Sequence, residues 1–265
     1  MKTRRHAAGV RLCAFGLFSF TGKQKPAGRL VWGDENMKQK DYQCWESYML
    51  SCMGDTAHDR EHIYRVLYQA MELAKGEAGV DYEVLTAACL LHDIGRKEQY
   101  EDPSVCHAAA GARKAYVFLT ENGYDVGFAG KVADCIRTHR YRKDAPPESL
   151  EAKLLFDADK LDAAGAIGAA RTLLYHGKEN EPLYSMTEDG KVSDGTKDTE
   201  PSFFREYKYK LEKLYGQFFT EKGRELAQTR RDASRRFYES LLAEAREAYR
   251  GREVLKELLD GQDPE

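Results

Sequence analysis

The amino-acid sequence predicts an all-α protein, built as a single helical bundle domain with further helices at its C-terminal end. Apolar residues recur at intervals of three and four along most of the chain, which is the spacing of one helix face. Ser, Thr or Asp precedes several of these segments and Gly follows them, as at the two ends of helices. The alternation of apolar and polar residues typical of strands is nearly absent. The clearest helical face consists of Ile63, Val66, Leu67, Ala70, Met71 and Ala74.

Capping residues and breakers divide the chain into the predicted helices. One helix starts with the capping pattern at Thr56 and ends before Gly76. Asp81 caps the next, which is apolar on every side up to Leu91 and is therefore expected to be buried. Ser149 caps a further helix. Other helices are expected at 38–54, 104–122, about 126–139, 203–219 and 221–249, with polar loops at 96–102, 141–147 and 177–202. The last loop is long and polar enough to be an insertion without fixed structure.

The N-terminal segment is treated apart from the predicted domain. Arg4-Arg5 and the apolar run from Leu12 to Phe20 are similar to a short signal peptide. No small-residue cleavage site closes the run, so we expect a disordered or misassigned extension with Met37 as the true start. The predicted division is 1–37 as the extension, 38–250 as the domain and 251–265 as a charged tail.

Composition narrows the function classes. With 42% hydrophobic and 32% charged residues, the chain can bury a substantial core. A net charge of −3 gives no basic footprint, and we expect no nucleic-acid partner. No apolar run reaches the length of a membrane-spanning helix, so no membrane partner is expected. Six cysteines without a Cys-x-x-Cys pair indicate reduced thiols and a cytoplasmic protein.

A vicinal pair, His92-Asp93, follows the buried helix, and Gly95 fits the left-handed position just past a helix end. Five of the seven histidines lie between residues 58 and 139, most of them on segments of apolar helical periodicity. Several buried imidazoles together with buried carboxylates would lose their hydration without compensation. The sequence therefore predicts a metal centre.

Three elements in order resemble the HD-domain superfamily of metal-dependent phosphohydrolases. These are His62, the pair His92-Asp93, and Asp159 in Ala-Asp-Lys-Leu, and the resemblance spans residues about 40–175. The stretches Asp157–Gly168 and Thr220–Ala227 are similar to a bacterial subgroup in which some members hydrolyse nucleoside triphosphates to monophosphate and pyrophosphate. The resemblance implies a helical HD-type domain whose metal ligands are His62, His92, Asp93 and Asp159.

Two imidazoles and two carboxylates suit one divalent ion. We favour Mn²⁺, with Fe²⁺, Zn²⁺, Co²⁺ and Mg²⁺ as alternatives. His107 and His139 fall where binuclear relatives carry extra ligands; we expect them to bind substrate phosphate, and a second metal is the alternative. His58-Asp59 is read as a helix start. Asp157 is expected to support a ligand from behind or to be structural.

Cationic residues next to the predicted ligands are candidates for holding phosphate, because charge stabilisation dominates phosphoryl transfer. Asp162, one helical turn beyond Asp159, is expected to orient a ligand or a lysine. The catalytic candidates are Arg65, Arg96, Lys97, Lys160 and Asp162.

The predicted activity is divalent-metal-dependent hydrolysis of a small nucleotide-like phosphate, with nucleoside triphosphate pyrophosphohydrolysis as its sharpest form. A phosphomonoesterase, a cyclic phosphodiesterase and a non-catalytic nucleotide-sensing module remain as alternatives. The sequence lacks the ligand pattern of an EF-hand and the glycine loops that cradle nucleotide phosphates. The oligomeric state is left open, a dimer included.

Overall fold

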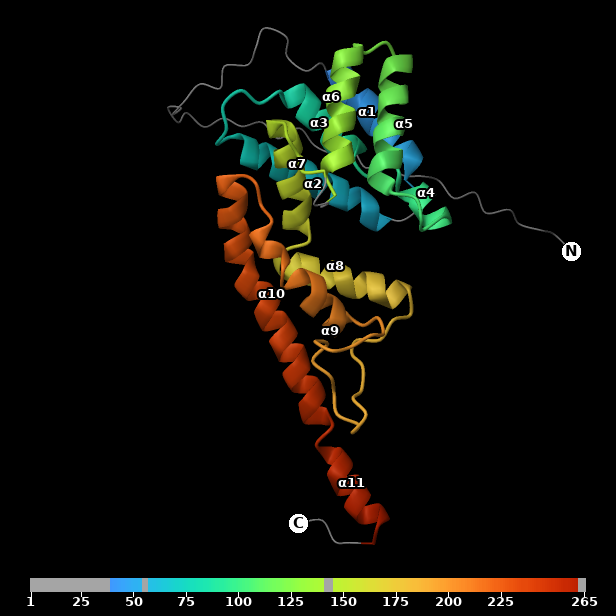
Figure 1. Cartoon of the computed structure of the whole chain (residues 1–265), viewed down its shortest axis with the longest axis vertical. Helices are drawn as coiled ribbons and strands as arrows, with labels where there is room; N and C mark the ends of the chain where they lie inside the picture. The colour runs from blue at the N-terminus through green and yellow to red at the C-terminus, as the bar shows by residue number, and fades with distance from the viewer. Residues whose placement is uncertain (1–38, 54–56, 141–144, 262–265) are drawn as a thin grey trace, which may run out of the picture. The chain divides into compact units, whose positions relative to one another are not determined.

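The computed structural model describes residues 39–53, 57–140 and 145–261, without the side chains of residues 57–59. Contacts group Met37–Glu265 as one compact unit, and all described helices lie in it (Figure 1). The α-helices are α1 Gln39–Cys52, α2 Ala57–Ala74, α3 Tyr82–Leu91, α4 Arg96–Glu101, α5 His107–Glu121, α6 Val126–Thr138, α7 Leu150–Asp162, α8 Gly165–Lys178, α9 Phe203–Glu206, α10 Glu221–Ala248 and α11 Gly251–Leu259. The all-α prediction is confirmed. Predictions for 1–37, Thr56, the His58 and Asp59 side chains and 141–144 lie outside the described part.

Helix α3 is the centre of the core. Every residue from Val84 to Leu91 is buried, as its apolar composition on all sides predicts. It contacts α1, α2, α6 and α7. Asp81 caps α3 by accepting a hydrogen bond from the Val84 N–H, as predicted. The polar pair that follows Leu91 is therefore delivered to the inside of the bundle.

The chain after α3 differs from the prediction. Residues 96–102 were expected to be a loop, but Arg96–Glu101 form α4. Glu98 pairs with Lys114 of α5, and the Asp102 N–H closes the helix on the Glu98 carbonyl. The polar composition of residues 96–102 could not indicate that Lys114 of α5 stabilises a helix there. Helix α5 begins at His107, three residues after the predicted start, because residues 103–105 form a turn.

A glycine is required at position 95 for a different reason from the one predicted. Its φ of −93° and ψ of 7° are not left-handed, so the expected glycine cap is wrong. A Cβ at this position would lie 2.3 Å from the His107 carbonyl oxygen and 2.5 Å from the Gly111 nitrogen. Gly95 is therefore needed for the close approach of the His-Asp turn to α5.

Helix α7 links the core to the C-terminal helices. Ser149 caps it through the Ala152 N–H, as predicted. Asp157 accepts hydrogen bonds from the backbone N–H of Phe219 and from both the N–H and the hydroxyl of Thr220. Thr220 in turn caps α10. Asp157 thus fixes the start of α10, in agreement with the structural role expected for it.

The segment between α8 and α9 is a loop, as predicted, but it makes specific contacts and is not a segment without fixed structure. It contains an antiparallel bridge between Met186 and Val192, and Val192 is buried. The Tyr238 hydroxyl of α10 donates to the Asp194 carbonyl. The bond from Tyr238 joins residues 44 positions apart in the sequence, so local polarity gave no sign of it.

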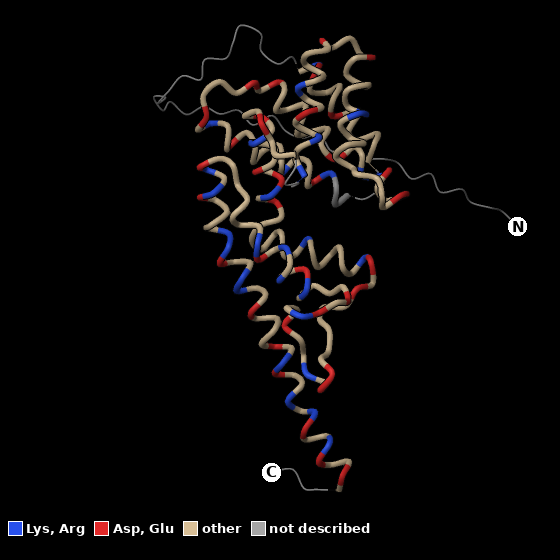
Figure 2. The backbone as a smooth tube through the Cα atoms, viewed as in Figure 1, with Lys and Arg blue, Asp and Glu red and all other residues tan. Residues whose placement is uncertain are grey.

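Two more boundaries differ at the C-terminal end. The helix expected at 203–219 is divided into α9, a π-helical turn Tyr207–Leu211 and a 3₁₀ turn Leu214–Gly216. The expected tail contains helix α11, which has no buried residue. Charged residues of both signs are spread along α10 and α11 (Figure 2). None of the described helices has both the length and the apolar character required to cross a membrane.

Candidate metal centre

Three helices and the segments that follow two others bring six polar residues together inside the bundle. His62 comes from α2, His107 from the first position of α5, and Asp159 from the last turn of α7. His92 and Asp93 follow α3, and His139 follows α6. We call these residues the polar cluster: His62, His92, Asp93, His107, His139 and Asp159.

The polar cluster divides into two groups that each could hold a metal ion. In the first group, His62, His92 and Asp159 offer ligand atoms that all lie within 4.8 Å of one another. The Nε2 atoms of the two histidines are 3.4 Å apart, and His62 Nε2 is 3.3 Å from Asp159 Oδ1. Asp93 Oδ2 lies 3.6 Å from His62 Nε2 and 3.7 Å from His92 Nε2. The four residues that the resemblance implies as ligands therefore converge.

The second group consists of Asp93, His107 and His139, again with ligand atoms within 4.8 Å of one another. Asp93 Oδ1 is 3.6 Å from His107 Nε2 and 3.7 Å from His139 Nε2. All three residues are buried. Asp93 thus directs one carboxylate oxygen toward each group.

All four imidazoles turn the same nitrogen toward the centre. Nδ1 of His92 and of His139 lie 2.8 Å and 2.6 Å from the carbonyl oxygens of Cys89 and Ile136. A carbonyl can only accept a hydrogen bond, so these Nδ1 atoms carry the proton and Nε2 keeps its lone pair. His62 and His107 are held likewise, by Asp162 at 2.7 Å and by the Gln99 amide oxygen at 2.7 Å. Such second contacts typically fix metal-binding histidines.

Burial and neighbouring charges set the protonation of the polar cluster. Burial lowers the pKa of His92 to about 4, and burial together with Arg96 lowers that of His107 to about 3. Burial also opposes the charge on His62, but Asp159 and Asp162 outweigh it and raise the pKa to about 9. Metal binding at His62 therefore requires the loss of a proton.

The carboxylates are held in the ionised form. Burial alone would raise the pKa of Asp93 and Asp159, but Arg96 and His92 beside Asp93, and Lys160 and His62 beside Asp159, hold both pKa values well below their usual range. Ionised carboxylates and lone-pair imidazoles are the forms that bind divalent metals. The mixed nitrogen and oxygen donors of the polar cluster fit ions such as Mn²⁺, Fe²⁺ or Zn²⁺.

Asp162 lies directly behind the polar cluster. Its Oδ2 accepts from His62 Nδ1, and its two oxygens accept from Nε and Nη2 of Arg65 at 2.6 Å and 3.0 Å. Arg171 of α8 also donates to Oδ2. Asp162 is buried, and these cations with His62 lower its pKa to about 2 against the effect of burial. The carboxylate therefore orients His62.

The other predicted cations occupy different positions. Arg96 Nε is 2.9 Å from Asp93 Oδ1, and Arg96 remains half exposed. Lys160 Nζ is 3.6 Å from Asp159 Oδ2 and lies over the Phe156 ring. Lys97, in contrast, is 71% exposed and pairs with Glu101 at 3.9 Å. Arg96 and Lys160 border the polar cluster, whereas Lys97 extends toward solvent.

Sequence reasoning missed Gln99, Arg171 and the carbonyls of Cys89 and Ile136. Gln99 lies in a segment taken for a loop, where it faces His107 only because α4 is helical. Carbonyl oxygens are present at every residue and give no sequence signal. Only the spacing of one helical turn between Cys89 and His92, and between Ile136 and His139, could have indicated these bonds.

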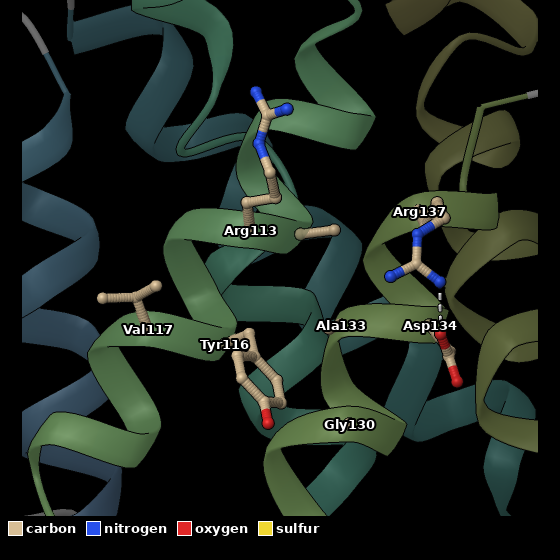
Figure 3. Close-up of a pocket in the computed structure, with 8 residues that line it drawn as sticks. Arg113, Tyr116, Val117, Gly130, Ala133, Asp134 and Arg137 are labelled. Atoms are coloured by element: carbon tan, nitrogen blue, oxygen red, sulfur yellow. Dashed lines mark hydrogen bonds and ion pairs between the residues drawn. The ribbon is translucent and has the colours of Figure 1, made fainter.

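A separate hollow lies between α5 and α6 (Figure 3). Arg137 forms an ion pair with Asp134 at its edge, and the Tyr116 ring lies along it (Figure 3). The lining residues are Ala112, Arg113, Tyr116, Val117, Gly130, Ala133, Asp134 and Arg137. None of them belongs to the polar cluster, which is therefore the better candidate site.

Comparison with known proteins relates this chain to the HD domain family. The HD domain family model matches residues 60–164. YpgQ of Bacillus subtilis is 27% identical over 190 residues, which cover 70% of this chain and 83% of YpgQ. The crystal structure of YpgQ in complex with ADP superposes with a TM-score of 0.58 at 25% identity, covering 77% of this chain and 95% of that one. A predicted HD superfamily hydrolase from an uncultured Thermotogales bacterium is 30% identical, with a TM-score of 0.51 and coverage of 78% and 92%.

Proposed function

Because this chain belongs to the HD-domain superfamily of metal-dependent phosphohydrolases, we propose that it hydrolyses a small nucleotide at the polar cluster. The observation that carries the proposal is the convergence of four Nε2 atoms and the carboxylates of Asp93 and Asp159, of which His62 alone has to lose a proton to bind a metal. The sharpest form of the proposal is cleavage of a nucleoside triphosphate to monophosphate and pyrophosphate. The ADP bound by YpgQ supports a nucleotide as substrate.

His62, His92, Asp93 and Asp159 would hold the catalytic metal, for which we propose Mn²⁺. A divalent ion in such a site polarises phosphate oxygens and lowers the pKa of the attacking water. Asp162 keeps Nδ1 of His62 protonated, so that Nε2 faces inward. The protein thus supplies a site whose ligands are oriented before metal binding.

The role of His107 and His139 is open to two proposals. Donation to a substrate phosphate requires an Nε2 proton, but in each ring it is Nδ1 that donates, to the Gln99 amide oxygen or to the Ile136 carbonyl. Burial and Arg96 also keep His107 neutral, with its pKa lowered to about 3. We therefore favour a second metal held with Asp93 over the phosphate-binding role that the sequence suggested.

The surrounding cations would hold the phosphates. Arg96 is half exposed beside Asp93, which places its guanidinium charge where substrate oxygens would bind. Lys160 adds a positive charge beside Asp159. Arg65 donates two hydrogen bonds to Asp162. Its role would therefore be to hold Asp162 in place rather than to bind substrate. Such positioned charges supply most of the catalysis of phosphoryl transfer.

The proposal is tested with the double variant His92→Ala/Asp93→Ala. We expect loss of bound metal and of turnover, with helicity largely retained, because both side chains follow α3 rather than belong to it. The measurements are elemental analysis, circular dichroism, and phosphate and pyrophosphate release from a nucleoside triphosphate panel with Mn²⁺. His176→Gln, at a buried histidine of α8 outside the polar cluster, is the matched control.

The products distinguish the alternatives. Pyrophosphate release supports the sharpest form, whereas release of orthophosphate alone points to a phosphomonoesterase. Turnover restricted to cyclic nucleotides indicates a phosphodiesterase. Nucleotide binding by the metal-loaded wild type without any product would contradict hydrolysis and identify a sensing module. Retained turnover in the double variant would contradict the assigned site.

A further inference from the structure

One face of α8 runs from Asp162, the carboxylate behind His62, to an exposed aromatic surface. Arg171, Tyr175 and Lys178 are four and three residues apart, so they share one face of the helix. Arg171 donates to Asp162 behind His62, at one end of this face. At the other end, Lys178 Nζ lies 5.6 Å from the centre of the Tyr100 ring of α4. This face of α8 therefore faces α4.

Arg96 connects the same two helices to the metal ligands. It contacts Asp93 at 2.9 Å, and Tyr100 lies one helical turn beyond it on the same side of α4. Arg96 also lies near enough to the Tyr175 hydroxyl to lower its pKa, although burial and the charges of Glu179, Glu181 and Glu206 raise it overall. Tyr100 and Tyr175 thus lie on two helices with Arg96 close to both.

The two tyrosines are unusually open to solvent. Among the tyrosines in the described ranges, Tyr100 and Tyr175 are the most exposed, at 77% and 62%. A large aromatic ring left in water loses the burial that usually stabilises it. Flat rings exposed next to cations are the surfaces on which nucleobases stack.

We propose that Tyr100 and Tyr175 form the nucleobase subsite of the substrate. This inference rests on the proposed function, since it places the phosphates at the polar cluster and the base against the tyrosines. Arg96 would lie between the two, where its guanidinium can reach phosphate oxygens. Stacking depends on the flat face that every base has and not on its hydrogen-bonding groups. Purine and pyrimidine nucleotides would therefore both bind.

The test measures binding, which does not depend on turnover. Calorimetry compares ADP with inorganic pyrophosphate on the Mn²⁺-loaded full-length protein, in the wild type and in Tyr100→Ala, Tyr175→Ala and Tyr175→Phe. We expect each alanine variant to weaken ADP binding by about five- to a hundredfold, as for other base-stacking residues. Pyrophosphate affinity should stay unchanged, and Tyr175→Phe should bind ADP like the wild type because the ring remains.

Tyr116→Ala is the matched control, since Tyr116 is an exposed tyrosine in the hollow between α5 and α6 (Figure 3). It should leave both affinities unchanged. Unaltered ADP binding in both alanine variants would overturn the subsite, as would equal losses for ADP and pyrophosphate. A wild type that binds ADP no better than pyrophosphate would overturn it too. Failure of the proposed function would appear separately, as intact binding without hydrolysis.

Discussion

At the scale of single residues, the site depends on side chains that orient other side chains. Asp162 holds His62 by one oxygen while Arg65 and Arg171 hold Asp162. The carboxylate is buried and ionised, because the cations and His62 lower its pKa to about 2. An orienting group of this kind controls both the tautomer and the direction of the metal-binding nitrogen.

Asp162→Asn is therefore expected to weaken metal binding while leaving the four ligands in place. The amide can present its NH₂ group to His62 Nδ1, which would move the imidazole proton to Nε2. We expect a loss of about 10- to 100-fold in Mn²⁺ affinity, measured by titration of metal-free protein. Asp134→Asn is the control, because Asp134 is 70% exposed and pairs with Arg137 on α6. Equal Mn²⁺ affinities in the two variants would argue against an orienting role.

The residues of the site differ in how far the sequence could predict them. His62, His92, Asp93 and Asp159 stand in the order of a family motif, so the resemblance to that family implied them as ligands of one ion. Gln99 and Arg171 are common surface residues whose roles depend on α4 and α8 packing beside the polar cluster. The sequence therefore indicates which residues can bind a metal, but it does not indicate which residues of distant helices contact them.

At the scale of elements, the His-Asp turn and α5 approach each other closely at Gly95. The Cβ that Gly95→Ala would add lies 2.3 Å from the His107 carbonyl oxygen, and a backbone atom cannot rotate away. The turn and α5 must separate, and we expect a destabilisation of about 1–3 kcal/mol or more. Denaturant unfolding measures it, and Mn²⁺ affinity should fall with it because His92 and His107 move apart.

For Gly130→Ala, in the neighbouring helix α6, we expect the opposite effect on stability. Gly130 lies in the middle of α6, and a Cβ there would meet nothing within 4 Å. Alanine should stabilise the protein by about 0.5–1 kcal/mol, because glycine loses more backbone entropy in a helix. A Gly95→Ala variant as stable as Gly130→Ala would show that the turn can shift without cost.

The elements that sequence reasoning misjudged share a physical cause. Helix α4 is supported by Lys114 of α5, and the segment before α9 is supported by Tyr238 of α10. Periodicity and capping are local signals, so they predicted α3 and α7 with their caps at Asp81 and Ser149. They could not show which polar segments find partners elsewhere.

At the scale of the whole molecule, the polar cluster joins helices that are distant in sequence. His62 and Asp159 are almost 100 residues apart, yet His62 Nε2 and Asp159 Oδ1 lie 3.3 Å from each other. A divalent ion held there would connect α2, the turn after α3, and α7 in the folded state. The unfolded chain offers no such arrangement, so binding free energy becomes stability.

Mn²⁺ is therefore expected to raise the thermal unfolding temperature of the metal-free protein. At a free concentration of 100 times Kd, the stabilisation is about 2.7 kcal/mol, or roughly 5–10 °C for a chain of this size. Differential scanning calorimetry with and without Mn²⁺ measures the shift, and EDTA should reverse it. His92→Ala/Asp93→Ala should unfold at the same temperature in both conditions. A shift of equal size in that variant would mean that the ion binds elsewhere on the folded chain.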